Sequence, residues 1–288
     1  MKMKYLGFVL ILLSSSVVFA GDYANLRFVG FSKDGQYMAF EESGEWDVHS
    51  GGDYANTYFI DVEKNAYAVP PITYDWSENM DRHTGRYSQN ATLARYKAAV
   101  AAAMRRFRIV PGNTGQLVAA HLISDHSFER SEKKSTQFMQ ADDTWVEREV
   151  PSYEGQWLSP DYDPNTIIFN PTYYPVNPNN EDFYELKLKT LPSPKPCDAR
   201  GNPTESPMFE MTLTDHTHHT DLAPQVLQRD KTLPAARGCV TAYTIEQVYF
   251  YNDNLAIFIN VYTPGFPGSS MRYMAVTGRL EYESNPKG

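Results

Sequence analysis

Eight short segments rich in aromatic and β-branched residues follow one another through the C-terminal two thirds of the 288-residue chain. Segments this short, separated by proline and glycine, are typical of strands rather than helices. We therefore predict a mainly β (α+β) fold of layered antiparallel sheets with one amphipathic helix packed on them. The strand segments are 117–123, 144–150, 166–170, 183–189, 208–214, 242–251, 255–262 and 271–281.

The N-terminal part of the chain carries the clearest turn signal. Aromatic and branched residues flank Asp34-Gly35 across residues 26–42, and an Asp-Gly pair supplies the positive φ angle of a tight hairpin turn. A glycine-rich loop at 50–52 precedes a further strand at 57–62. The pattern resembles one blade of a TolB-type β-propeller. Because only a faint second copy occurs, at 157–161, we predict one propeller-blade-like hairpin and no propeller.

One segment, residues 88–110, has a clear helical period. Its apolar side chains recur at helical spacing, and five alanines between residues 98 and 103 raise its helix propensity. Pro111-Gly112 follows as a stop signal. We predict one amphipathic helix over 88–110. Its apolar stripe consists of Leu93, Tyr96, Val100, Met104 and Phe107.

The first 20 residues have the pattern of a secretory signal peptide. Lys2 and Lys4 form a basic end, an apolar run follows, and Val18-Phe19-Ala20 precedes the cleavage site. The apolar run is shorter than the ~20 residues that a membrane-spanning helix needs, which disfavours the alternative of a retained anchor. We predict a signal peptide over 1–20 and a single mature domain over 21–288. The protein is then secreted or periplasmic and does not span the membrane.

Both cysteines, Cys197 and Cys239, lie in the mature part of the chain. In an oxidising compartment two cysteines most simply form one disulfide. Two free thiols or a metal-binding pair are the alternatives. The chain has no Cys-x-x-Cys motif, so a thioredoxin-like redox role has little support.

Several segments together resemble a bacterial family of predicted secreted proteins of unknown function, the domain of unknown function 2259. The resemblance implies export and a bond between Cys197 and Cys239. It brings no known activity, ligand or catalytic residue, and it is weak over 82–148 and around the histidines at 216–219. The segments that carry it are 28–62, the alanine- and arginine-rich helix, 185–191, 233–239, 264–268 and 272–280.

Three of the seven histidines and two aspartates lie between residues 215 and 221. Imidazole and carboxylate are the usual ligands of zinc, copper and nickel, and His216 and His218 would share one side of an extended strand. The metal hypothesis is a divalent ion held by Asp215, His216, His218 and Asp221. The simpler alternative is a solvated histidine-rich loop without a metal.

The predicted helix lies in a block of positive charge. No acidic residue occurs between Arg82 and Ser124, while seven arginines and lysines do, and the rest of the mature chain carries a net charge of −18. Such a helix could meet anionic lipid headgroups, lipopolysaccharide phosphates or an acidic protein. The favoured alternative is that its cations pair with acids of the same chain. The helix cations are Arg95, Lys97, Arg105, Arg106 and Arg108.

Aromatic residues also cluster in the chain, as Tyr173-Tyr174 and Tyr249-Phe250-Tyr251. They could line a groove for glycans or peptides. Tyrosine at alternate strand positions is more typical of half-buried sheet surface, and we predict that role for them.

No motif of a known enzyme class is present: the chain lacks a Gly-x-Ser-x-Gly elbow, a zinc-protease helix, a P-loop and a dinucleotide fingerprint. The net charge of −9 disfavours a nucleic-acid partner. We predict an exported envelope protein without catalytic or cofactor-binding residues, which binds an envelope protein or a small ligand. The alternative is an envelope hydrolase or metal-dependent enzyme that uses the segment 216–219.

Overall fold

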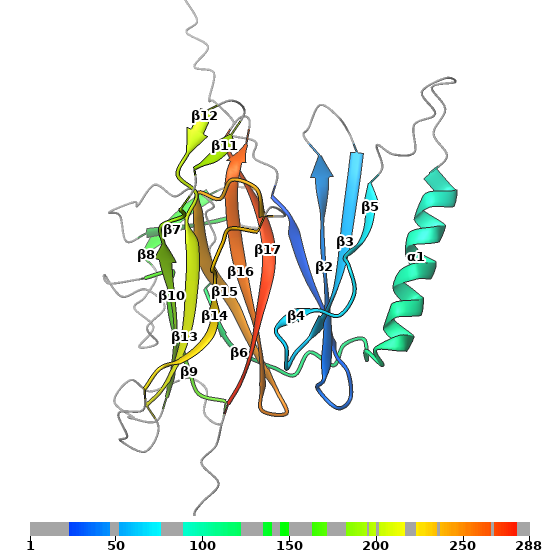
Figure 1. Cartoon of the computed structure of the whole chain (residues 1–288), viewed down its shortest axis with the longest axis horizontal. Helices are drawn as coiled ribbons and strands as arrows, with labels where there is room; N and C mark the ends of the chain where they lie inside the picture. The colour runs from blue at the N-terminus through cyan, green and yellow to red at the C-terminus, as the bar shows by residue number, and fades with distance from the viewer. Residues whose placement is uncertain are drawn as a thin grey trace, which may run out of the picture.

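The computed structural model describes residues 23–46, 52–75, 89–121, 135–139, 145–149, 163–171, 183–194, 196–199, 202–216, 223–234, 237–265 and 268–280. Within these ranges the chain forms one helix and mostly antiparallel β-sheet, which confirms the predicted fold class. Figure 1 shows the arrangement: three sheets stand face to face, and the helix lies at one end of the stack.

Five strands form the first sheet, in the order β1-β2-β3-β4, with β5 also paired to β3. The predicted turn at Asp34-Gly35 joins β1 to β2, with Gly35 at φ +75°. Ser32 Oγ donates a hydrogen bond to Asp34 Oδ1 across this turn, at 2.6 Å. The blade-like hairpin is thus confirmed. The strand that follows it begins at Gly52, inside the predicted glycine-rich loop, and not at residue 57. The strands are β1 (Asn25–Phe31), β2 (Tyr37–Trp46), β3 (Gly52–Asp61), β4 (Ala66–Tyr67) and β5 (Ile72–Asp75).

The central sheet has the order β17-β16-β15-β6. Asn252 and Asp253 form the turn between β15 and β16, both at positive φ (47° and 62°), as a type I′ hairpin turn requires. The predicted bounds of β15 are confirmed residue for residue. The strands are β6 (Gln116–Ala120), β15 (Ala242–Tyr251), β16 (Asn254–Gly265) and β17 (Gly268–Arg279).

The third sheet has the order β14-β13-β10-β9, and two short ribbons accompany it. Its strands are β9 (Thr166–Phe169), β10 (Tyr184–Leu191), β13 (Met208–Asp215) and β14 (Gln225–Arg229). The ribbons pair β7 (Ser135–Met139) with β8 (Trp145–Glu149), and β11 (Cys197–Ala199) with β12 (Asn202–Thr204).

The central sheet is buried on both faces, and β16 shows this best. Its residues Leu255, Ile257, Ile259 and Val261 pack toward the third sheet, while Ala256 and Phe258 pack toward the first. Tyr249 and Tyr251 join the second of these cores as partly buried side chains, which confirms the predicted sheet-surface role for that pair. Tyr173-Tyr174 and the faint blade copy at 157–161 lie outside the described residues.

The predicted helix is present as α1 (Gln89–Arg106), which packs on the outer face of the first sheet. Tyr96, Ala103 and Phe107 are buried there. The predicted end at residue 110 is wrong, because a backbone turn stops the helix four residues earlier. Arg108 takes a left-handed φ of 52°, and the N–H groups of Arg108 and Ile109 bond to the carbonyls of Arg105 and Met104. This is a Schellman motif, formed here without the usual glycine.

Candidate functional site

Helix α1 lies at one end of the molecule (Figure 1), and it presents basic side chains to solvent. The four cations within the helix are all exposed, as is Arg108 just after it. Between them lie exposed alanines rather than acids: Ala91, Ala94, Ala98, Ala99, Ala101 and Ala102. The outer face of α1 therefore combines positive charge with small side chains. The four helix cations are Arg95, Lys97, Arg105 and Arg106.

The favoured expectation, that these cations pair with acids of the same chain, finds no support within the described residues. The ion pairs there join other residues: Arg27–Glu41, Lys64–Asp61, Arg229–Glu210, Arg237–Asp230 and Arg272–Glu42. Arg95 donates instead to Thr92 Oγ1 at 3.2 Å. One carboxylate does sense a cation of this group. The pKa of Asp34 is lowered mainly by hydrogen bonds from Ser32 and the Gln36 N–H, and slightly by the charge of Arg108.

The position of α1 on the sheet is set by its buried face. The Tyr96 hydroxyl contacts Thr57 Oγ1 at 2.7 Å and donates to Glu41 Oε2 at 3.1 Å, and burial raises the pKa of Tyr96 to about 12. Directly after the helix, the Phe107 ring packs against the rings of Tyr37 and Phe59, with centroids 5.0 and 5.5 Å apart. Contacts near the middle and at the C-terminal end of α1 therefore hold its basic face in a defined orientation.

A groove of about 360 Å³ runs between α1 and the chain that leads into β5. Its walls are apolar, with exposed Ala99 and Ala102 on the helix side. Arg106 is the charged residue of the lining, and its guanidinium lies over the Phe107 ring, 5.1 Å from the centroid. No pattern in the sequence indicates this groove, because its second wall comes from the loop before β5 and from the first residue of that strand. The lining residues are Val69, Pro70, Ile72, Ala99, Ala102, Ala103, Arg106 and Phe107.

The histidine segment falls mostly outside the described residues. Asp215 ends β13 and His216 follows it, whereas His218 and Asp221 lie outside the described part of the chain. The His216 ring stacks on Phe183 with centroids 4.5 Å apart, and the His216 N–H bonds to the Phe183 carbonyl. Among the described residues, no group of three or more His, Cys, Asp or Glu could hold a metal ion. The metal site with Asp215, His216, His218 and Asp221 stays a prediction.

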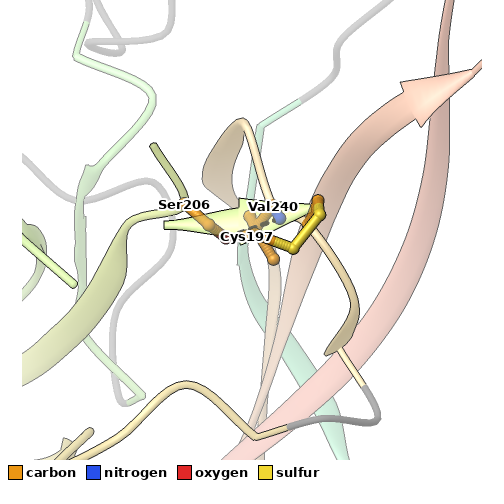
Figure 2. The surroundings of a disulfide bond; sticks show 4 residues. Cys197, Ser206 and Val240 are labelled. Atoms are coloured by element: carbon orange, nitrogen blue, oxygen red, sulfur yellow. Dashed lines mark hydrogen bonds between the residues drawn. A yellow bond between two sulfur atoms is a disulfide. The ribbon is translucent and has the colours of Figure 1, made fainter. Parts of the chain in front are cut away.

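The predicted disulfide is present. Cys197 and Cys239 are bonded, with their Cα atoms 5.4 Å apart. Figure 2 shows Ser206 and Val240 beside the bond; the Val240 N–H donates to Ser206 Oγ at 2.7 Å. The bond ties the β11–β12 ribbon to the chain that enters β15.

Two residues before Cys239, Arg237 forms a buried clasp with Asp230 and Phe209. Arg237 belongs to the segment 233–239, which is one of those that carry the family resemblance. Arg237 forms a two-pronged ion pair with Asp230: Nη2 donates to Oδ1 at 2.9 Å and Nη1 donates to Oδ2. The guanidinium also lies over the Phe209 ring, 4.8 Å from its centroid. Asp230 Oδ2 accepts the Phe209 N–H as well, at 3.1 Å. The Arg237 side chain is thus engaged by Asp230 and by the Phe209 ring inside the fold.

Two carboxylates from different sheets, buried Glu42 and half-buried Glu246, meet around Tyr273, between the first and central sheets. Glu42 Oε2 accepts the Tyr273 N–H at 2.7 Å. Burial raises the pKa of Glu42, partly offset by this bond, by Arg272 and by Asn56. Burial likewise raises the pKa of Glu246, partly offset by its hydrogen bonds with Tyr273 and Asn260. Glu42 is 2% exposed and Glu246 is half-buried, and both contact Tyr273 where the two sheets pack.

These raised pKa values predict a pH dependence of stability. The folded state keeps protons on Glu42 and Glu246 at pH values where the unfolded chain has lost them, so their contribution to the free energy of unfolding falls as pH rises from about 4.5 through the folded-state pKa values. Each group can contribute a slope of up to about 1.4 kcal/mol per pH unit in that window. We expect Glu246→Gln to flatten this fall in urea unfolding curves measured across pH. Glu63→Gln, at an exposed acid, should leave it unchanged, and an equal effect of both variants would contradict the assignment.

Within the described residues, no helix is long and apolar enough to cross a membrane. Comparison with curated proteins and with solved structures gave no match. A family model described as predicted secreted protein, DUF2259, matches residues 39–279. This range includes most of β2 and the rest of the first sheet after it, α1, the disulfide and the clasp around Arg237. The chain therefore belongs to the DUF2259 family of predicted secreted proteins.

Proposed function

We propose that the protein is an exported, non-enzymatic binding protein of the bacterial envelope, which binds an acidic segment of a partner protein through the outer face of α1. Residues 1–20 serve as the signal peptide, and residues 21–288 form the working protein in the periplasm or outside the cell. The family description as a predicted secreted protein supports export.

One observation carries this proposal: exposed cations cluster on α1 without a carboxylate partner among the described residues. The chain as a whole has a net charge of −9, so this face opposes the charge of the rest of the molecule. A local field of opposite sign steers an anionic partner to one orientation. The contacts of Tyr96 and Phe107 hold the face rigid, which lowers the entropy cost of binding.

An acidic protein fits this face better than an anionic membrane. Helices that lie in a membrane surface carry large apolar side chains such as Trp, Phe or Leu opposite their basic residues. The exposed apolar residues of α1 are alanines. Leu93, Val100 and Met104 are half-buried, and Tyr96 and the adjoining Phe107 are buried against the first sheet. Small side chains permit close approach of a second backbone, as in helix pairs and strand–helix contacts.

The test measures binding of a fluorescein-labelled oligoglutamate peptide to residues 21–288 by fluorescence anisotropy. We expect binding at about 20 mM NaCl that weakens strongly at about 200 mM. Arg95→Glu with Lys97→Glu should lower the affinity at least about tenfold. The matched control is Lys187→Glu with Lys189→Glu, which makes the same charge change at exposed positions of β10 and should change the affinity less than about twofold.

Two results would overturn the proposal. One is equal loss of affinity in the α1 variant and the β10 control, since the binding would then reflect net charge alone. The other is binding to vesicles of phosphatidylethanolamine and phosphatidylglycerol without binding to the peptide, which would make the partner a membrane surface.

A further inference from the structure

The groove beside α1 is flanked by one line of helix residues: Arg95, Ala99, Ala102 and Arg106. Their spacing of four, three and four residues places them on the same side of a helix. Ala99, Ala102 and Arg106 line the groove directly. Arg95 lies on the same line, 11 residues before Arg106, which corresponds to about 16 Å along the helix axis. The line thus has methyl groups in the middle and a cation at each end.

The space over the two alanines is apolar. Val69, Pro70 and Ile72 form the opposite wall, and Phe107 contributes from the buried face of the helix. At about 360 Å³ the groove is at the lower end of the range for ligand pockets. Ala99 and Ala102 are exposed, so side chains from a partner can reach the apolar lining without displacing any part of the described chain.

We infer that this groove receives an apolar side chain of the acidic partner segment, with carboxylates on either side of it bound by Arg95 and Arg106. This inference rests on the proposed function and specifies the partner. In an extended chain side chains alternate between two sides and each residue rises about 3.3 Å, so residues four positions apart point to the same side about 13 Å apart. The flexible stems of the two arginines cover the difference from the span of about 16 Å. The partner segment therefore carries two carboxylates four residues apart with an apolar residue midway between them.

Charge complementarity selects this occupant. A purely apolar ligand would offer no carboxylate to the guanidinium groups of Arg95 and Arg106. A purely acidic segment would offer no apolar side chain to fill the groove. A segment with both features buries apolar surface against the alanines while its carboxylates accept hydrogen bonds from guanidinium groups, the charge-assisted bonds that arginine forms best.

The test uses three labelled peptides and the mature protein. The first peptide has two glutamates four residues apart and a leucine midway between them, so that all three side chains point to the same side of an extended chain. In the second a glycine replaces the leucine, and in the third glutamines replace the glutamates. We expect the leucine peptide to bind about tenfold or more tightly than the glycine peptide, because a leucine is removed from water. The glutamine peptide should bind at least about tenfold more weakly than the first.

Two variants show whether the leucine sits in the groove. Ala102→Trp places an indole in the groove, and Ala101→Trp places one at an exposed alanine outside its lining. The preference for leucine over glycine should disappear in the first variant and persist in the second, and circular dichroism should show that both are folded. The inference is overturned if the wild type binds the leucine and glycine peptides equally, or if the preference survives Ala102→Trp.

The failures of the inference and of the proposed function differ. If binding is lost on charge reversal of α1 but shows no preference for leucine, the basic face binds acidic segments and the groove plays no part. If no glutamate-containing peptide binds, both are wrong.

Discussion

Replacing Arg237 with methionine is expected to lower the free energy of unfolding by about 3–5 kcal/mol, because it leaves a buried carboxylate without its counter-ion. The side chains of Asp230 and Arg237 are 2% and 13% exposed, so solvent screens their interaction little. Burial by itself would lower the pKa of Arg237, but the hydrogen bonds with Asp230 and Tyr243 outweigh that effect and the pKa is raised. The variant also removes the cation from the Phe209 ring. Urea unfolding at neutral pH measures the loss.

A double variant separates the lost ion pair from the lost packing. Asp230→Asn retains an acceptor for the Phe209 N–H and removes the buried charge. In combination with Arg237→Met it should therefore recover part of the stability lost in the single variant, as buried pairs replaced together are often tolerated. Arg237→Lys keeps the charge without the two-pronged geometry and should fall between the wild type and Arg237→Met. A loss below about 1 kcal/mol in Arg237→Met would be inconsistent with a buried pair.

Removing the disulfide is the second large effect that we expect. The bond closes a loop with a sequence separation of 42 residues, and the loop-closure model assigns such a bond about 4 kcal/mol through the entropy of the unfolded chain. Cys197→Ser together with Cys239→Ser should lower stability by up to that amount. Changing both cysteines avoids a free thiol that could form bonds between molecules.

The wild type under reducing conditions is the matched control for that variant. If the stabilisation comes from the bond itself, reduced wild type and the double serine variant should unfold at similar urea concentrations, and both well below the oxidised protein. Oxidised and reduced wild type with the same stability would contradict the prediction.

The sequence was most informative where local chemistry decides the structure. The Asp34-Gly35 turn and the strand Ala242–Tyr251 were predictable, because turn residues and long runs of aromatic and branched residues act over short distances. Strand β14 (Gln225–Arg229) was not predicted, since its residues are largely exposed or half-buried and its pairing with β13 decides its conformation. The end of α1 was misplaced for a similar reason, because Arg108 adopts a conformation that sequence preferences assign to glycine.

The candidate site likewise has one part that could be predicted from the sequence and one part that could not. Its cations could be identified from the absence of acids between Arg82 and Ser124. The groove could not, because Ile72 and Ala102 are 30 residues apart and meet only when α1 packs on the first sheet. The ion-pair partner of Arg237 could not be predicted from the sequence either. Asp230 is one of 35 acidic residues, and only the fold shows that it lies buried beside Arg237.

The central sheet is covered on both faces, and its strand β16 lies near the end of the chain. The N-terminal residues that pack on it can therefore be covered only after nearly the whole chain has been made or exported. Phe258 of β16 packs against Phe28 and Phe40, with ring centroids 5.1 and 5.4 Å apart, although more than 200 residues separate them along the chain. A chain that is synthesised or exported from its N-terminus carries these two rings uncovered until almost its whole length has emerged. Contacts this distant in sequence also slow folding. Any chain that stops before residue 254 lacks β16 and β17, two of the four strands of the layer that both cores share, and so exposes parts of the inner faces of the first and third sheets to proteases and to other chains.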